Sequence, residues 1–449
     1  MASLPLLTVL DKSHVSPPPA TVGDMSLPLN FFDFLWLRSP PVHNLFFYEL
    51  PITKIRFIEI VIPNLKQSLS ITLQHFYPFV GNLIAFPTEK PEIRYVEGDS
   101  VEVTFAECNL DFSELIANHP RDCAKFYHLI PLLGEPDITP GYIKIPIFSV
   151  QVTFFPNCGI SIGMTNHHTL GDASTRFCFM KAWTSIARSG TDESFLANGT
   201  LPLYDRVSQK PKLDESYLKF ARYETLREDY ENQTLSGPTD KLRATFIFTR
   251  SVINQLKNNV STQLPTLAYV SSFTVACSYI WSCMAKARND DLQLFGFTID
   301  CRARMDPQVP PAYFGNCVGG CMAMTKTTVL TGKDGFITAA KFLGESLHKT
   351  LTDKDGIVKD IGSYSNLFSE GMPTTMIGVA GTPKLKFYDM DFGWGKPKKL
   401  ETISIDYSGA ISMNSCKESN EDLEIGVCLS TTEMEDFVRI FEDGLKAYI

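Results

Sequence analysis

Two short apolar segments with alternating side chains frame the most distinctive polar stretch of the chain. Residues 148–154 and 160–165 alternate with a period of two, and turn residues separate them, so the pattern predicts a β-hairpin. Farther on, apolar residues recur at helical spacing, and these are Phe179, Met180, Trp183, Ile186 and Ala187. His167 and His168 therefore lie where a buried strand gives way to a helix, a common place to present a side chain to a cleft.

The same periodicities predict strands and helices in both halves of the chain. The expected strands include 102–105, 243–249 and 423–429, and the expected helices include 63–76, 251–260 and 271–288. Thr432 and Glu435 have the spacing of a capping box and predict the start of a final amphipathic helix. Strands mixed with helices throughout indicate an α/β or α+β fold with mixed sheets.

Residues 198–219 interrupt this pattern with glycine, prolines and many charges, and they lack periodicity. We interpret them as a crossover between an N-terminal domain, residues 1–197, and a C-terminal domain, residues 220–449. A length of 449 residues suits two or three domains.

Composition excludes several classes of protein. The formal net charge of −9 argues against a nucleic-acid surface, which needs a basic face. We expect no membrane association, because no apolar stretch approaches the length of a membrane span, and we see no targeting segment. The 11 cysteines lack paired zinc-like spacing and indicate reduced thiols. We expect a cytoplasmic monomer.

His168 and Asp172 form a His-x-x-x-Asp pattern, which alone is a weak indication of function. Both residue types also bind metals. However, His348 is the only later histidine, and no cysteine or glutamate nearby has useful spacing, so we expect no metal site.

Two further motifs make the His-x-x-x-Asp pattern more specific. Residues 391–395 read Asp-Phe-Gly-Trp-Gly, and residues 313–317 read Tyr-Phe-Gly-Asn-Cys. With residues 27–33 and Trp36, these motifs resemble the plant BAHD acyl-CoA-dependent acyltransferases, in particular their anthocyanin and flavonoid branch. The resemblance runs along the whole chain. Ala173 departs from it, since the wider family usually has glycine there.

The resemblance implies two domains of the chloramphenicol-acetyltransferase type with a channel between them. It implies malonyl-CoA as co-substrate, a sugar hydroxyl of a flavonoid glucoside as acceptor, and no permanently bound cofactor. Three alternatives stay open: an aromatic acyl-CoA donor, a condensation-type domain that uses carrier-bound thioesters, and a non-catalytic ligand-binding relative.

Acyl transfer to an alcohol needs a base, and histidine has a suitable pKa. We therefore expect His168 to be the base. Asp172 either orients the imidazole or holds its loop through an arginine. Residues 297–304 alternate like a strand that carries Arg302 and Arg304 on one face, which favours the second role. By resemblance Arg302 is the partner of Asp172, and Arg304 is the second candidate.

Arg176 follows Asp172 by four residues, so it forms either a simple helical ion pair or a clamp for the malonyl carboxylate. The matching arginine of similar malonyltransferases suggests the clamp. By resemblance Lys257, Ser271 and Ser272 contact CoA, and a helix N-terminus with hydroxyls suits phosphate. Asp391 is expected to support a tight turn rather than to touch substrate.

Overall fold

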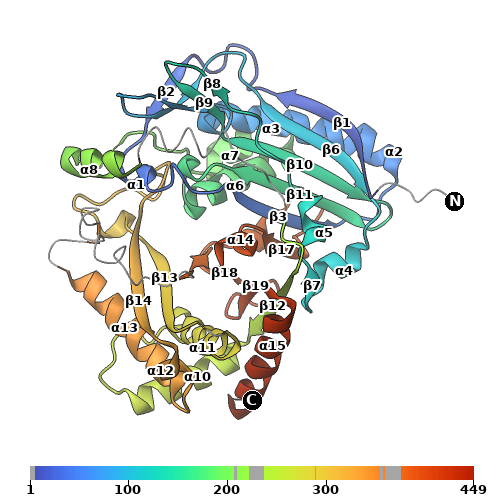
Figure 1. Cartoon of the computed structure of the whole chain (residues 1–449). Helices are drawn as coiled ribbons and strands as arrows, with labels where there is room; N and C mark the ends of the chain where they lie inside the picture. The colour runs from blue at the N-terminus through green and yellow to red at the C-terminus, as the bar shows by residue number, and fades with distance from the viewer. Residues whose placement is uncertain are drawn as a thin grey trace.

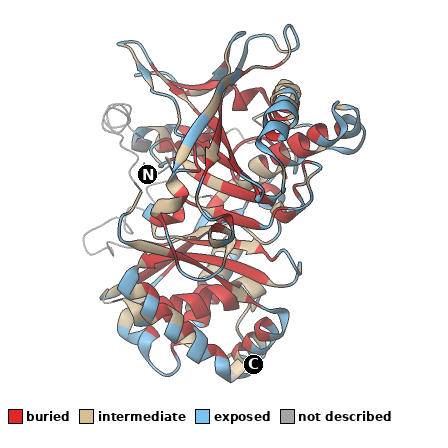
Figure 2. Ribbon diagram, turned by 90° about the vertical axis from the view of Figure 1, so that its right-hand side faces the viewer, coloured by how far each residue is buried: buried red, intermediate tan, exposed pale blue. Residues whose placement is uncertain are grey.

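The computed structural model describes residues 6–206, 210–221, 237–288, 290–353, 357–358 and 376–448. Two halves, each built from sheets and helices, lie against one another (Figure 1). Buried residues fill the sheets and the inward sides of the helices (Figure 2), and Trp183 and Trp281 are among the largest buried side chains of the two main hydrophobic cores. This mixed α/β architecture is the predicted fold class.

The first half is built on a six-stranded sheet. Its strand order is β1 (Leu7–Val15), β6 (Val101–Cys108), β10 (Phe148–Phe155), β11 (Gly159–Asn166), β3 (Val42–Glu49) and β17 (Lys399–Thr402). The predicted hairpin is confirmed, because β10 and β11 pair antiparallel with Phe148 opposite Asn166. Every residue of both strands is buried, so this hairpin lies in the centre of its half.

A smaller sheet and two long helices complete the first half. The sheet has the order β2 (Met25–Pro28), β5 (Glu92–Tyr95), β4 (Asn82–Ala85), β9 (Ile143–Pro146) and β8 (Asp137–Ile138). The helices are α3 (Ile62–His75) and α6 (Ala173–Ser189), and they pack against each other. All five apolar residues that predicted α6 face inward, as expected for an amphipathic helix.

The second half contains two further sheets. One has the order β16 (Val379–Ala380), β18 (Ile411–Ser415), β19 (Leu423–Ser430), β12 (Lys241–Phe248) and β7 (Arg121–Asp122), and the other has the order β14 (Val318–Lys326), β13 (Leu292–Asp300) and β15 (Met376–Ile377). Its helices are α10 (Arg250–Gln263), α11 (Ser272–Ala287), α12 (Thr327–Thr331), α13 (Gly335–Thr352) and α15 (Thr431–Leu445). The strands predicted over 243–249 and 423–429 and the helices predicted over 251–260 and 271–288 are confirmed within three residues at their ends.

Shorter helices connect these elements. They are α1 (Phe31–Phe34), α2 (Lys54–Arg56), α4 (Phe112–Ile116), α5 (Ala124–Tyr127), α7 (Glu193–Asn198), α8 (Pro211–Ala221) and α14 (Ile405–Ser408). Helix α8 lies inside the stretch that we interpreted as an aperiodic crossover. Its Asp214 is buried and accepts a hydrogen bond from the backbone of Phe31 at 2.8 Å, so α8 docks on α1 partly through a polar contact that a hydrophobic pattern does not reveal.

The cap of the last helix differs from the prediction. Ser430 and Glu433 form the capping box of α15, whereas Thr432 and Glu435 were expected to do so. Strand β19 runs directly to Ser430, so the first capping pair after the strand is the one that the helix uses. The apolar face is as predicted, with Met434 and Phe437 buried.

The two halves exchange strands where they meet. β17 comes from the second half of the sequence but pairs with β3, and β7 comes from the first half but pairs with β12. At this crossing lies a buried set of charges that we call the junction cluster: Arg121, Arg243, Glu401 and Asp406. Glu401 pairs with Arg121 at 2.8 Å and with Arg243 at 3.1 Å, and Asp406 pairs with Arg243 at 3.4 Å. Buried ion pairs therefore tie the halves together.

All 11 cysteines are free thiols. Cys123 and Cys428 come closest, with their sulfurs 3.3 Å apart beside Asp406. Among the described residues, no helix is both long and apolar enough to cross a membrane.

Candidate active site

His168 stands at the exit of the central hairpin. The chain leaves β11 after Asn166, and His167 caps a 3-10 turn, His168–Leu170, by accepting a hydrogen bond from the Thr169 backbone at 3.2 Å. Gly171 follows with φ +149°, and a Cβ there would lie 2.7 Å from the Thr175 side chain. Glycine is thus required for the chain to turn sharply from the hairpin into α6.

The Asp172 carboxylate is fully engaged with groups that shape this turn. It caps α6 by accepting from the backbones of Ser174 at 3.0 Å and Thr175 at 3.2 Å. Arg302 binds it with two hydrogen bonds, at 2.8 and 3.2 Å, and the Cys317 backbone donates a further one at 3.1 Å. The contact of Asp172 with Arg302 is the one that the family resemblance implied, and it spans the two halves of the chain.

Arg302 reaches Asp172 from a turn and not from a strand, so the strand predicted over 297–304 is too long. Strand β13 ends at Asp300, whose side chain accepts a hydrogen bond from the Arg302 backbone at 3.0 Å. Such an Asx turn competes with strand pairing. Arg302 therefore turns inward and is buried, whereas Arg304, the second candidate, is exposed. Since Arg302 is paired with Asp172, it is held away from a role in binding substrate charge.

Arg176 lies in the first turn of α6 and is largely shielded from solvent. Its guanidinium donates to the Gly171 carbonyl at 2.9 Å, and within the described part of the chain no carboxylate lies in ion-pair distance of it. The helical ion pair with Asp172 is absent there, because Arg302 occupies that carboxylate. Burial lowers the pKa of Arg176 to about 10, and Asp172 opposes this shift only in part. Arg176 is thus a cation with unused capacity for an anion.

The His168 imidazole lies between an aromatic ring and this cation. Trp36 stacks on it, with ring centroids 3.8 Å apart and planes at 9°. Burial lowers the pKa of His168 to about 3, and the nearby Arg176 cation acts in the same direction. The imidazole is consequently neutral at physiological pH, which is the protonation state of a general base before it acts.

Asn316 joins His168 to the N-terminal segment. Its side-chain NH₂ donates to the Asp33 carboxylate and to the His168 carbonyl, both at 3.0 Å. Neither Asn316, Asp33 nor Trp36 was assigned a role from the sequence, although all three belong to the segments that carry the family resemblance. They are 132 or more positions away from His168 in the sequence, so residue spacing gave no indication of these contacts.

Asp391 holds a tight turn, as the resemblance implied. Its carboxylate accepts from the backbones of Gly393 at 2.7 Å and Gly395 at 2.9 Å, and both glycines have positive φ, +95° and +92°. Between them and Asp391, Phe392 packs edge-on against Trp183 of α6 at 5.0 Å. This turn thereby supports the helix that begins at Asp172.

The residues expected to contact CoA lie in the second half. Lys257 is a partly exposed residue of α10. Ser271 caps α11 by accepting from the Thr274 backbone at 3.1 Å, and Ser272 is the first residue of that helix. The described contacts do not join these residues to His168.

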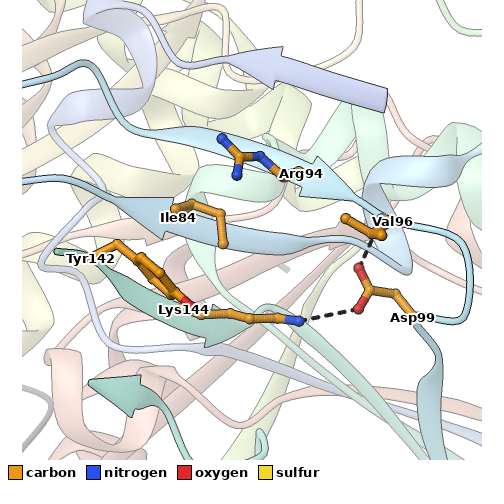
Figure 3. A pocket seen from close by; sticks show the side chains of 6 residues that line it. All are labelled: Ile84, Arg94, Val96, Asp99, Tyr142 and Lys144. Carbon is orange, nitrogen blue, oxygen red and sulfur yellow. Dashed lines mark hydrogen bonds and ion pairs between the residues drawn. The ribbon is translucent and has the colours of Figure 1, made fainter. Parts of the chain in front are cut away.

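A pocket of about 200 Å³ lies on another sheet. Figure 3 shows its lining, which comes from β4, β5, β9 and neighbouring loops: Ile84, Arg94, Val96, Asp99, Tyr142 and Lys144. Lys144 and Asp99 neutralise each other across it at 3.2 Å. Lys144 is paired in this way, whereas Arg176 beside His168 has no carboxylate partner among the described residues.

Comparison with known proteins agrees with this geometry. A family model described as the Transferase family matches residues 6–444. The chain is 51% identical to malonyl-coenzyme A:anthocyanin 3-O-glucoside-6''-O-malonyltransferase of Dahlia pinnata, with 100% of each chain covered. It is 41% identical to phenolic glucoside malonyltransferase 1 of Nicotiana tabacum, over 98% of this chain and 100% of the relative. Vinorine synthase shares the fold, with a TM-score of 0.70 at 21% identity over 96% of each chain.

Proposed function

Because the chain belongs to the Transferase family of BAHD acyltransferases, we propose that it transfers a malonyl group from malonyl-CoA to a sugar hydroxyl. The acceptor is an anthocyanidin or flavonoid 3-O-glucoside, and the reacting group is the 6'' hydroxyl of its glucose. The identity of 51% to the Dahlia pinnata enzyme over the whole chain supports both substrates.

The observation that carries the choice of donor is Arg176. A guanidinium close to the base, without a carboxylate partner among the described residues, suits a ligand with its own carboxylate. Malonyl-CoA has such a carboxylate on its acyl group, whereas a coumaroyl group would place an aromatic ring beside an unpaired cation. The geometry therefore favours malonyl over the aromatic donor.

In the proposed mechanism His168 is the general base. It takes the proton from the sugar hydroxyl while the oxygen attacks the thioester carbonyl. The new C–O bond forms, the C–S bond breaks, and the protonated imidazole returns its proton to the CoA sulfur. Within the described residues no serine or cysteine side chain hydrogen-bonds the His168 imidazole, so direct transfer in a ternary complex is favoured over an acyl-enzyme.

The other site residues have supporting roles in this proposal. Asp172 and Arg302 hold the loop that carries His168, and the turn at Asp391 supports helix α6. Lys257, Ser271 and Ser272 are proposed to meet the CoA phosphates. No permanently bound cofactor or metal is needed for this chemistry.

We further propose a monomeric, cytoplasmic enzyme of two acyltransferase domains, residues 1–197 and 220–449, joined by 198–219. Both proposed domains of one chain supply the site, with Asp172 from the first and Arg302 from the second, so a second copy is not needed to complete it. Eleven free thiols suit a reducing compartment. Light scattering on the purified protein tests the oligomeric state.

A panel of donors and acceptors tests the function. Malonyl-, acetyl- and coumaroyl-CoA are each assayed with anthocyanidin and flavonol 3-glucosides. We expect malonyl-CoA to give the highest kcat/KM. A preference for coumaroyl-CoA would establish the aromatic donor instead, and the absence of turnover with every donor would overturn the proposal.

A further inference from the structure

Two buried cysteines and an aspartate meet where the halves of the chain join, outside the site around His168. Cys123 follows β7, Cys428 lies in β19, and Asp406 lies in α14. The two sulfurs are 3.3 Å apart, and one carboxylate oxygen of Asp406 lies within 4.8 Å of both. Because 305 positions separate the cysteines in the sequence, residue spacing does not reveal this group. Its three ligand atoms are close enough to share one metal ion.

One oxygen of the aspartate is left without a partner in the described part of the chain. Asp406 is fully buried, and its Oδ2 pairs with Arg243 at 3.4 Å. Its Oδ1 is also shielded from solvent, but no described group forms a hydrogen bond with it. A buried carboxylate oxygen in this situation is unfavourable, because it has lost its water and gained no other partner. A cation beside Oδ1 would supply the missing interaction.

The ligand set suits zinc better than the other common divalent metals. Mg²⁺ and Ca²⁺ prefer oxygen ligands, whereas Zn²⁺ binds thiolate and carboxylate together. In a tetrahedral site with Zn–S bonds of about 2.3 Å, the two sulfurs are about 3.8 Å apart. The observed 3.3 Å is close to that separation, so a small rotation of either thiol reaches it.

The charges around this group also accommodate the ion. The two arginines of the junction cluster balance its two carboxylates, so the region is neutral while the thiols keep their protons. Zn²⁺ would replace the two thiol protons, which pass to solvent, and two thiolates with one Zn²⁺ carry no net charge. The ion therefore adds no uncompensated charge to a buried region, where such a charge would be expensive.

A disulfide is the competing arrangement for the two cysteines, and the sheet disfavours it. Strand β12 lies between β7 and β19. The Cys123 backbone donates to Lys241 on one side of β12, and Cys428 lies opposite Arg243 on the other side. Two strand spacings are roughly 9 Å, whereas the Cα atoms of a disulfide are about 4.4–6.8 Å apart. The side chains reach toward each other across β12, which suits an ion between them better than a direct bond.

A fourth ligand is needed, because structural zinc in proteins is almost always tetrahedral. The hydroxyl of Tyr127 is shielded from solvent and has no hydrogen-bond partner among the described residues. Burial raises the pKa of this hydroxyl, and the neighbouring Asp406 and Cys123 act in the same direction, so it lies beside the group. It is therefore placed to hold a water molecule in the fourth position.

We propose that Cys123, Cys428 and Asp406 bind a structural Zn²⁺ that joins the two halves of the chain. One ligand comes from the first half and two come from the second, so the ion acts as a cross-link at the junction. The described contacts do not connect these ligands to His168. The ion stabilises the fold and takes no part in the proposed acyl transfer.

Metal analysis of the whole enzyme tests the site directly. The protein is expressed with zinc in the medium, purified without metal-affinity resin or chelator, and measured by inductively coupled plasma mass spectrometry. We expect about one zinc per chain, and less than about 0.2 zinc per chain would overturn the proposal. Copper in place of zinc would also overturn it, as would a disulfide between the two cysteines in a peptide map. None of these results depends on malonyl transfer.

Cys123→Ser and Cys428→Ser test the ligands. Each should lower the bound zinc to about a fifth of the wild-type content or less. If either variant does not fold, alanine at the same position replaces serine under the same criteria. Cys277→Ser is the matched control and should keep the zinc, because Cys277 is a buried free thiol of α11 that does not belong to the group. Wild-type zinc content in Cys428→Ser would show that the ion binds elsewhere.

Cobalt substitution and chelation test whether the ion is held by sulfur and is structural. Co²⁺ in the zinc position should give the near-ultraviolet absorption band of cobalt–thiolate bonds, and Cys428→Ser should lack this band. A strong chelator should lower the melting temperature of the wild type by about 5 °C or more, and that of Cys428→Ser by less than about 1 °C. While the chelated wild type is folded, its kcat should stay within about twofold. An unchanged melting temperature, or a larger loss of kcat, would overturn the structural role.

Discussion

Two buried groups of charges join the halves of this chain, and they differ in whether every charge is paired. In the junction cluster each arginine has a carboxylate partner and each carboxylate has an arginine partner, at 2.8 to 3.4 Å. The second group, which we call the His168 cluster, consists of His168, Asp172, Arg176 and Arg302. There Asp172 and Arg302 are paired, but Arg176 has no carboxylate among the described residues.

This difference separates a structural cluster from a functional one. Burying a charge is expensive, and complete pairing recovers most of the cost without doing chemistry. In the His168 cluster burial lowers the pKa of His168 to about 3 and that of Arg176 to about 10, whereas in the junction cluster the carboxylates outweigh burial and raise the pKa of Arg243. Perturbed groups that are incompletely paired are typical of binding and catalytic sites.

Removal of the proposed base gives the largest expected effect. His168→Ala should lower kcat/KM about 10²–10⁴-fold, because the sugar hydroxyl then loses its proton acceptor. Calorimetry should show that CoA still binds and circular dichroism that the fold is intact. A folded variant that keeps more than a tenth of wild-type turnover would remove His168 from the mechanism.

The paired carboxylates of the two clusters can be compared by Asp172→Ala and Glu401→Ala. Asp172→Ala leaves Arg302 with only the exposed Asp300 at 3.3 Å, and Glu401→Ala leaves Arg121 without a carboxylate partner among the described residues. Each should therefore cost on the order of 3–5 kcal/mol in the free energy of unfolding, measured with urea. At a temperature where both variants are folded, only Asp172→Ala should also lose activity. An unchanged melting temperature with lost activity for Asp172→Ala would point to direct orientation of His168.

Acid should weaken the protein through buried neutral histidines. Burial lowers the pKa of His43 to about 4 and of His167 to about 4, from an ordinary 6.5 in the unfolded chain. Between pH 6.5 and 4 the unfolded state therefore binds more protons. The two histidines contribute on the order of 2–3 kcal/mol each to the free energy of unfolding. This contribution is complete above pH 6.5 and is lost as the pH falls toward 4.

His43→Asn tests this assignment, because it removes one of the buried histidines whose pKa is lowered. Urea unfolding at pH 7, 6 and 5 should show a shallower loss of stability for the variant than for the wild type. Equal slopes for both proteins would show that His43 does not contribute to acid sensitivity.

Arg176→Ala should change donor selectivity. The charge-assisted hydrogen bonds to the malonyl carboxylate would be lost, worth roughly 1.5–3 kcal/mol, so kcat/KM for malonyl-CoA should fall about ten- to a hundred-fold relative to acetyl-CoA. Arg176→Lys should recover only part of this loss, since lysine lacks the planar fork. Arg188→Ala, an exposed arginine on the same helix, is the control. Equal losses with both donors would assign Arg176 to support of the helix.

The sequence predicted those elements of the fold in which apolar side chains repeat on one buried face. The five apolar residues of α6 and the alternating hairpin before it lie as predicted, because a single buried face repeats along each of them. Prediction failed where polar contacts decide the structure. The turn at Arg302 follows from a hydrogen bond of Asp300, and α8 is docked through the buried Asp214.

The residues of the candidate site differ in the same way in whether the sequence could predict them. His168 and Asp172 were identifiable because they lie between two predictable elements, and Arg302 because of the family resemblance. Asn316 and Trp36 reach the imidazole from distant segments, and periodicity reports which face a residue lies on but not which residue it meets. Only the folded structure brings these contacts together.

The smallest expected effect lies at Lys257, the proposed contact for CoA, which belongs to neither buried cluster. Lys257 is partly exposed, and a solvent-exposed ion pair contributes about 0.2–1 kcal/mol, so Lys257→Ala should raise KM for malonyl-CoA no more than about fivefold and leave kcat unchanged. Since salt screens exposed charges, the difference from wild type should shrink in about 0.5 M salt. Lys12→Ala, an exposed lysine on the edge strand β1, is the control and should not change KM. A change in KM that does not depend on salt, or a change in kcat, would place Lys257 among buried and desolvated contacts like those of the His168 cluster. A KM equal to that of wild type would show that CoA binds elsewhere.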